Sequence, residues 1–224
     1  MVASRLNSLV GRTDLTSVKQ ILDIGSWHLG QSIEFSKIFK EANIDAFEPV
    51  PDSYELCKKR WAELDDSKKK RIRIHNIALS ESVGAIPFYS VQPNNKKRLD
   101  AGFSSMFKFM DVMNGNDETL LLQQEIEVKT NRLDNWCEEN GVTEVDIIWM
   151  DVQGAELLVL KGAENILQHT KIIMTEVGLK PYYEGHTLKK DIDTFLFKKG
   201  FRELEGSFEI NIPEYEANVI YVRI

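Results

Sequence analysis

The chain has 224 residues, of which 42% are hydrophobic and 28% charged, and its formal net charge is −7. This composition excludes a disordered chain, and the acidic balance disfavours long phosphate backbones, so we expect no nucleic-acid partner. There is no run of about 18 apolar residues and no signal-peptide core, so we expect no membrane insertion and a cytoplasmic location.

The basic clusters, the two cysteines and the chain length each give a further expectation. Basic clusters occur at 58–60, 68–73 and 96–98, where an anionic substrate could bind, although charge runs beside turns are more typical of solvated faces. Cys57 and Cys137 lie in expected helices without a zinc-type spacing, which favours buried thiols. A length of 224 residues favours one domain spanning 1–224, with an extension at 1–19.

The first third of the chain alternates strands and helices. Residues 20–25 form a short apolar run that ends in Asp and Gly, and 31–41 carry apolar residues at helical spacing. A second strand at 44–49 precedes a helix that we expect to begin near Asp52 and Ser53, which are good N-cap residues. The alternating pattern of 71–80 predicts a third strand near a sheet edge.

The remaining elements complete a doubly wound sheet. A strand pair is expected at 84–90 and 125–130, and the long segment 92–120 between them predicts a lid over the site. We then expect helices at 131–140, 154–167 and 187–199, and strands at 145–150, 171–177, 201–206 and 218–224. The segment 145–150, apolar except for Asp146, is typical of a central parallel strand, and the two closely spaced C-terminal strands predict mixed pairing at one edge.

Polar residues end successive expected strands at Asp23, Glu48, Asn76, Asp151 and Glu176. In doubly wound sheets the ligand lies beyond the carboxyl ends of the strands, and a turn alone does not require acids at those positions. A shared polar pocket therefore explains these residues better than sheet stability does.

The pattern around this pocket favours a nucleoside without phosphates. The turn at Gly25 and Ser26 lets the backbone approach a ligand, but only Gly25 and Gly30 are glycines there, so the dinucleotide fingerprint is absent. This spacing argues against a nicotinamide-dependent oxidoreductase. Glu48 is expected to accept hydrogen bonds from ribose hydroxyls, with a solvated helix cap as the alternative. Pro49 and Val50 could form an apolar wall for adenine, and Asn76 could bind the edge of that ring.

Five blocks of the chain are distinctive, and they are ILDIGSWHLGQSIEFS, FEPVPDSYEL, HNIALSES, NRLDNWCEENGVTEVDIIWMDVQGAELLVLKGAENIL and TEVGLKPYYEGHTL. These blocks resemble the FkbM family of methyltransferases, and the densest match is MDVQGAELLVLKGA at 150–163. The resemblance covers roughly residues 20–200. It departs from the family pattern at Trp27, His28 and Leu29 before Gly30, at Trp149, where Lys is common, and at Gln153, where Glu is common.

The resemblance implies a Rossmann-like class I methyltransferase fold, an α/β architecture with a mostly parallel seven-stranded sheet and helices on both faces. It also implies S-adenosyl-L-methionine as cofactor and O-methylation of a hydroxyl. The expected cofactor-binding residues are Asp23, Gly25, Ser26, Glu48, Pro49, Asn76, Ala78 and Asp151.

The acceptor hydroxyl loses a proton during methylation, which calls for a base within hydrogen-bond reach. Asp151, at the end of a central strand, is the first candidate, and Glu176 is the second. Asp151, Glu176 and Glu156 could instead hold a divalent metal, although no metal ligand is assigned. Of the titratable histidines His28, His75 and His186, His186 lies where substrate could enter.

Softer expectations concern the aromatic residues. Tyr182 and Tyr183 could stack on a sugar face, and Phe103, Ser104 and Ser105 could close over the cofactor or merely anchor their loop.

The expected acceptor is a sugar, a glycan or a secondary metabolite. The alternative is a catalytically silent adenosyl-binding module, which Gln153 favours. Metal dependence and oligomeric state stay open.

Overall fold

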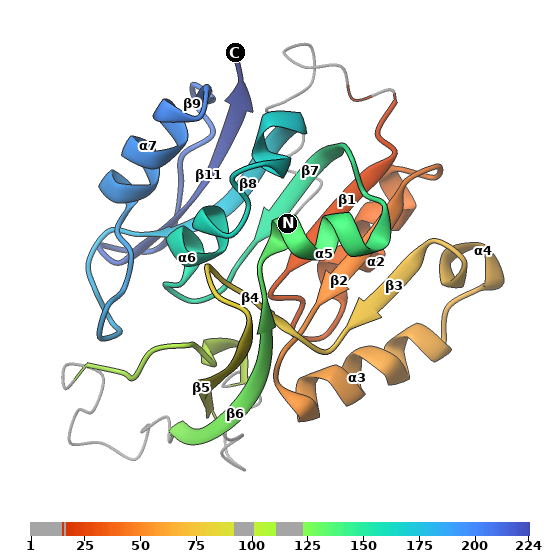
Figure 1. The fold of residues 1–224 in the computed structure, drawn as a ribbon, viewed down its shortest axis with the longest axis horizontal. Helices are drawn as coiled ribbons and strands as arrows, with labels where there is room; N and C mark the ends of the chain where they lie inside the picture. The colour runs from red at the N-terminus through yellow and green to blue at the C-terminus, as the bar shows by residue number, and fades with distance from the viewer. Residues whose placement is uncertain (1–14, 16, 92–100, 111–122) are drawn as a thin grey trace.

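The computed structural model of the chain describes residues 15, 17–91, 101–110 and 123–224. Within these residues a central sheet carries helices on both faces, and a smaller sheet of three strands lies beside it (Figure 1). Most of the expected extension at 1–19, and all of the expected lid except 101–110, lies outside the described residues. None of the described helices is long and apolar enough to cross a membrane.

The central sheet runs in the order β10-β11-β8-β7-β1-β2-β3, and β9 also pairs with β11. Parallel pairing joins β8, β7, β1, β2 and β3, whereas β11 is antiparallel to β8, β9 and β10. The expected mixed edge is therefore confirmed. The bounds are β1 Gln20–Ile24, β2 Asn43–Phe47, β3 Ile72–His75, β7 Val145–Met150, β8 Thr170–Gly178, β9 Phe201–Glu203, β10 Glu209–Ile212 and β11 Glu216–Arg223.

The expected seven strand positions are present, but the described sheet contains eight strands. β9 pairs with residues 221–223 of β11 and β10 pairs with 216–218, so the two short strands share one position beside β11. β10 was not expected from the sequence, because its residues are mostly exposed and show no buried face.

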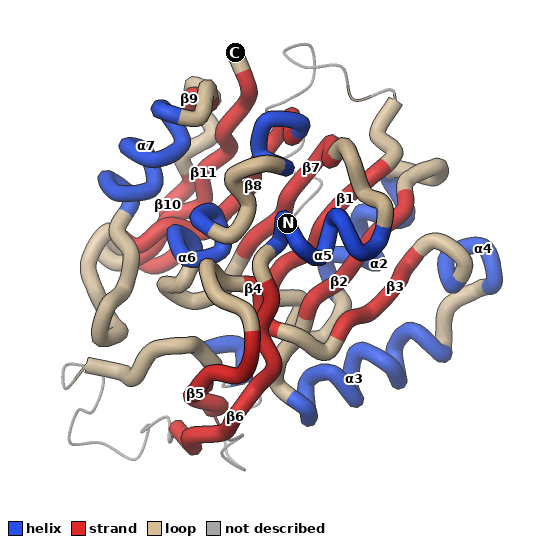
Figure 2. The backbone as a smooth tube through the Cα atoms, viewed as in Figure 1, coloured by secondary structure: helices blue, strands red, loops and turns tan. Residues whose placement is uncertain are grey.

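Helices cover the sheet on two sides, as Figure 2 shows. Phe35 of α2 packs with Trp149 on one face, and Trp136 of α5 packs with Ile148 and Ile192 on the other. Burial on both faces explains why the central strands are almost wholly apolar. The helix bounds are α2 Gly30–Ile38, α3 Pro51–Ala62, α4 Asp66–Lys69, α5 Leu133–Asn140, α6 Glu156–Lys161 and α7 Lys189–Lys198.

Three boundaries differ from expectation for local reasons. α3 begins at Pro51, because proline is pre-organised for the first helical position, and Val50 precedes it as N-cap. The expected strand 71–80 is two strands, since the chain leaves the main sheet after His75 and its β4 (Ala78–Leu79) pairs with β6. The expected helix 154–167 ends at Lys161, and a separate 3-10 turn follows at Ile166–His169.

The smaller sheet has the order β4-β6-β5. Its strands β5 (Gly84–Val91) and β6 (Gln123–Asn131) are antiparallel, which confirms the expected pair. The described part of the expected lid, residues 101–110, bridges Tyr89 of β5 through Ser105 and is named the cover segment below. This sheet therefore places a covering segment next to the carboxyl ends of the main strands.

Candidate active site

A partly open cavity lies at the carboxyl ends of β1, β2 and β7, and the empty space within it, open solvent included, is about 520 Å³. Gly25, Glu48 and Asp151, the residues that follow these three strands, all line it. The other lining residues are Ile24, Trp27, Phe47, Pro49, Val50, Ile77, Ala78, Leu79, Phe88, Gly102, Ser104, Met106, Val152 and Gln153. The cavity thus lies where doubly wound sheets bind their ligands.

Gly25 is the point at which two of these strand ends touch. Its φ of +85° is left-handed, and a Cβ built there would lie 1.8 Å from the carbonyl oxygen of Asp151. Asp151 N in turn donates to Ile24 O at 2.9 Å. Only glycine allows this close approach, so the floor of the cavity depends on the absence of a side chain.

Glu48 presents a buried carboxyl group to the cavity. Its Oε2 accepts from Trp27 N at 2.7 Å and its Oε1 accepts from Val50 N at 2.9 Å. Burial raises the pKa of Glu48 to about 8, against the opposing effect of these two hydrogen bonds. When Glu48 is ionised, each of its carboxyl oxygens has a further lone pair and can accept a hydrogen bond from a ligand hydroxyl.

The opposite part of the cavity is apolar. Val50, Ala78 and Phe88 form one buried cluster, against which Met106 of the cover segment packs. These side chains come from four separate places in the chain and line a slot suited to a flat ring. Phe88 and Met106 were missed by sequence reasoning, because only the pairing of the small sheet brings them to the cavity.

Three of the expected cofactor residues lie behind the cavity wall. Asn76 does not line it, since its amide donates to Glu48 O at 2.9 Å and Pro49 O at 3.1 Å. Asp23 accepts from Ser32 N at 3.0 Å, from the Ser32 hydroxyl and from Ser26 Oγ at 3.1 Å, and burial raises its pKa to about 6. Asn76, Asp23 and Ser26 therefore shape the turns that carry the cavity.

Asp151, Gln153 and Glu176 form a hydrogen-bonded group at the ends of β7 and β8. Gln153 Nε2 donates to Asp151 Oδ1 at 2.7 Å and to Glu176 Oε2 at 3.0 Å. Asn211 Nδ2 donates to Glu176 Oε1 at 2.6 Å, and Glu176 is not among the cavity-lining residues. Burial, with Asp151 and Glu216 nearby, raises the pKa of Glu176 well above its ordinary value.

The Glu156 carboxyl group bonds the turn that follows β7. Its Oε1 accepts from Val152 N and Gly154 N, both at 3.2 Å, and burial raises its pKa to about 8. It does not line the cavity, so its contacts fix the turn between β7 and α6. Across the described residues, no group of three or more His, Cys, Asp or Glu side chains is arranged to hold a metal ion.

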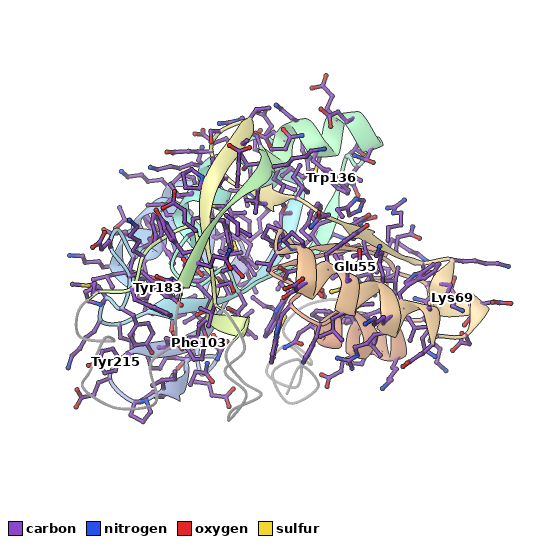
Figure 3. The ribbon with its side chains drawn as sticks, turned by 90° about the horizontal axis from the view of Figure 1, so that it is seen from below. Glu55, Lys69, Phe103, Trp136, Tyr183 and Tyr215 are labelled. Carbon is purple, nitrogen blue, oxygen red and sulfur yellow. The ribbon has the colours of Figure 1, made fainter. Side chains whose placement is uncertain are left out.

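The structure corrects the expectation that Tyr182 and Tyr183 stack on a sugar. They are 3% and 1% exposed, and their rings stack on Tyr215 and Phe109. Figure 3 shows Tyr183, Tyr215 and Phe103 together on one side of the molecule. Phe103 packs on the same cluster, which favours its anchoring role.

The histidines are placed by packing. His186 lies against Gly154 and Gly178, its Nδ1 accepts from Tyr182 N at 3.2 Å, and burial lowers its pKa to about 4. His28 stacks on Trp27, with ring centroids 4.1 Å apart. His75, the last residue of β3, forms a hydrogen bond with Asp45 of β2. None of the three lines the cavity.

Comparisons with known proteins agree with this geometry. A family model described as a methyltransferase FkbM domain matches residues 28–203. The 2-O-methyltransferase NoeI of Sinorhizobium fredii is 33% identical over 166 residues, which cover 74% of this chain and 65% of that protein. The hexuronic acid methyltransferase AglP of Haloferax volcanii is 26% identical over 159 residues, covering 69% and 57% respectively. The match thus spans less than two thirds of the length of each of these two relatives.

Among solved structures, a magnesium protoporphyrin IX methyltransferase from Synechocystis with bound S-adenosylmethionine superposes with a TM-score of 0.56. The two sequences are 11% identical, and the match covers all of this chain and 78% of the other. This likeness shows the fold, which is the Rossmann-like α/β fold of S-adenosylmethionine-dependent methyltransferases.

Proposed function

The chain belongs to the FkbM family of methyltransferases, and from this membership we propose that it methylates a hydroxyl group with S-adenosylmethionine as donor. The observation that carries the proposal is the cavity in which Gly25, Glu48 and Asp151 meet beyond three parallel strands. The acceptor class that we propose is a sugar, a glycan or a secondary metabolite, because the two relatives above are named for methylation at a 2-O position and of a hexuronic acid.

The residues of the cavity fit an adenosyl group. Glu48 would hold the ribose hydroxyls with the lone pairs that its backbone contacts leave free. Pro49, Val50, Ala78 and Phe88 would cover the adenine ring, because they line the apolar part of the cavity. Gly25 leaves the floor without a side chain. The first turn has only Gly25 and Gly30 and so lacks the glycine fingerprint that binds pyrophosphate, which disfavours a nicotinamide cofactor.

In the proposed reaction, residues of the chain align the acceptor hydroxyl with the methyl group of the cofactor and remove the proton of that hydroxyl. When bound, S-adenosylmethionine supplies an electrophilic methyl group on a positively charged sulfur. Asp151 faces the cavity from the end of β7 and would accept the proton that the acceptor hydroxyl loses. The cover segment contributes Gly102, Ser104 and Met106 to the wall and so excludes water from the reacting groups.

Two features bear on the alternatives. Gln153 bonds both Asp151 and Glu176, which supports the proposed activity over the alternative of a catalytically silent module. Glu176 already accepts hydrogen bonds from Gln153 and Asn211. We therefore propose Asp151, rather than Glu176, as the group that accepts the proton.

Calorimetric titration of S-adenosylmethionine and of NAD into the purified protein tests the cofactor. Glu48→Ala should weaken binding of S-adenosylmethionine about tenfold or more, because it removes hydrogen bonds to a carboxyl group. Glu138→Ala, an exposed substitution on α5, is the matched control. Tighter binding of NAD than of S-adenosylmethionine would overturn the assignment.

Turnover is tested with S-adenosylmethionine and a panel of methyl glycosides that includes neutral hexosides and hexuronosides. We expect a product one methyl group heavier, together with S-adenosylhomocysteine, and loss of that product in Asp151→Asn. Tight cofactor binding without any methylated glycoside would contradict a sugar acceptor.

A further inference from the structure

The side chain of Gln153, which lines the cavity, makes three hydrogen bonds. It is 8% exposed and lies in the left-handed region at φ +53°. Its Nε2 donates to Asp151 Oδ1 and Glu176 Oε2, and its Oε1 accepts from the Tyr183 hydroxyl at 2.8 Å. Its main-chain oxygen accepts from Ser105 Oγ of the cover segment at 2.7 Å.

These partners determine the orientation of the amide. A phenol hydroxyl donates to an amide oxygen and ionised carboxyl oxygens accept from an amide nitrogen, so the three neighbours favour this placement of oxygen and nitrogen. The Tyr183 hydroxyl also lies 3.1 Å from Phe103 O, which joins the cover segment to the same group. Both N–H bonds of Gln153 are therefore directed at carboxyl groups.

The surroundings of Asp151 are rich in acids. Titratable groups that face it come from β1, α6, β8, β11 and the loop after β8, and they are Asp23, Glu156, Glu176, Glu216 and Tyr183. Tyr182 and His186 lie in the same loop. A carboxylate at position 153 would add one more negative charge to this group and would remove both amide donors.

We propose that Gln153 is a positioning residue whose neutral amide holds the Asp151 carboxylate toward the acceptor and, through the Tyr183 hydroxyl, connects it to the cover segment. The inference rests on the proposed function for its catalytic consequence only. Gln153 acts through Asp151. Glutamine at this position, where glutamate is common in the family, therefore contributes to the proposed activity.

The test compares Gln153→Glu, which has the same shape but lacks the donors, with Gln153→Met, which lacks the donors and adds no charge. Gln168→Glu is the matched control, because it makes the same chemical change at an exposed position before the start of β8. Circular dichroism first establishes that each variant is folded. NMR of selectively labelled aspartate carboxyl groups then follows Asp151, which is identified by its absence from the Asp151→Asn spectrum.

We expect Gln153→Glu to move the midpoint of the Asp151 titration to higher pH by about one unit or more, since like charges disfavour ionisation. Gln153→Met should move it in the same direction by less, and Gln168→Glu should not move it. Unchanged midpoints in both Gln153 variants would overturn the proposal. This measurement needs no acceptor and so does not depend on turnover.

The second readout is the pH dependence of methyl transfer to the glycoside that responds in the panel. Gln153→Glu should lower kcat about tenfold or more near neutral pH and displace the rising limb upward, with KM for S-adenosylmethionine within about threefold of the unsubstituted protein. If kcat falls by the same factor at every pH in both variants, Gln153 has a structural role and the positioning proposal is rejected. Shifted midpoints with an unmoved rate profile would instead refute Asp151 as the base, which is a failure of the proposed function.

Discussion

Replacing Gly25 with alanine tests whether contact between β1 and β7 builds the cavity. The new Cβ would lie 1.8 Å from Asp151 O and 2.8 Å from Asp151 C, so the turn and the Asp151 backbone must separate by about 1.2 Å to reach an allowed contact. Left-handed alanine costs about 1 to 2 kcal/mol. Overpacking against a main-chain atom adds about 1 to 3 kcal/mol.

We therefore expect Gly25→Ala to lower the free energy of unfolding by about 2 to 5 kcal/mol, measured by urea denaturation. The affinity for S-adenosylhomocysteine, measured by calorimetry, should fall about tenfold or more, because the separated strands widen the floor of the cavity.

Gly141→Ala isolates the backbone component of this effect. Gly141 is left-handed at φ +67°, and a Cβ there meets nothing within 4 Å. It should therefore lose only about 1 to 2 kcal/mol of stability and keep its ligand affinity. Equal losses in the two variants, with ligand affinity retained in Gly25→Ala, would refute the steric reasoning.

Three further predictions concern buried polar groups. The free energy of unfolding should fall between about pH 5 and pH 8, because burial raises the pKa of Glu48 and Glu156 to about 8 and the unfolded chain ionises first. Urea titrations at both ends of this range measure the fall, Glu156→Gln should reduce it, and constant stability would contradict the burial argument. Tyr183→Phe leaves Gln153 Oε1 without its buried donor and should cost about 1 to 3 kcal/mol in the same assay, whereas no loss would show that the amide finds another partner. Asp134→Ala removes the acceptor of two main-chain N–H groups at the start of the 3-10 turn 166–169 and should lower the melting temperature, and an unchanged value would assign that turn to packing alone.

Strand ends were the part of the site that could be located from the sequence. Gly25, Glu48 and Asp151 each follow an apolar run, and parallel strands bring such positions to one edge whatever the loops do. Their contact with a cavity follows from topology. Their roles toward a cofactor stay predictions.

Contacts across the loops could not be located in this way. Gln153 meets Glu176 and Tyr183 at separations of 23 and 30 positions, through side-chain directions that no periodic pattern encodes. The tyrosine pair in PYYEGHTL has the composition of a sugar platform, yet burial against Phe109 and Tyr215 decides its role. Similarly, the alternation of Ile72 and Ile74 shifts by one position at Ile77, where the chain changes sheets, and a single strand across 71–80 overlooks this shift.

The outer strands of the central sheet are short. β9, β10 and β3 contain 3, 4 and 4 residues, and the first two meet β11 at separate places. An incoming strand needs a long uninterrupted row of free N–H and C=O groups to add to a sheet. The described edges of this sheet offer only brief rows, so the central sheet should resist the addition of a further strand even when the chain is concentrated.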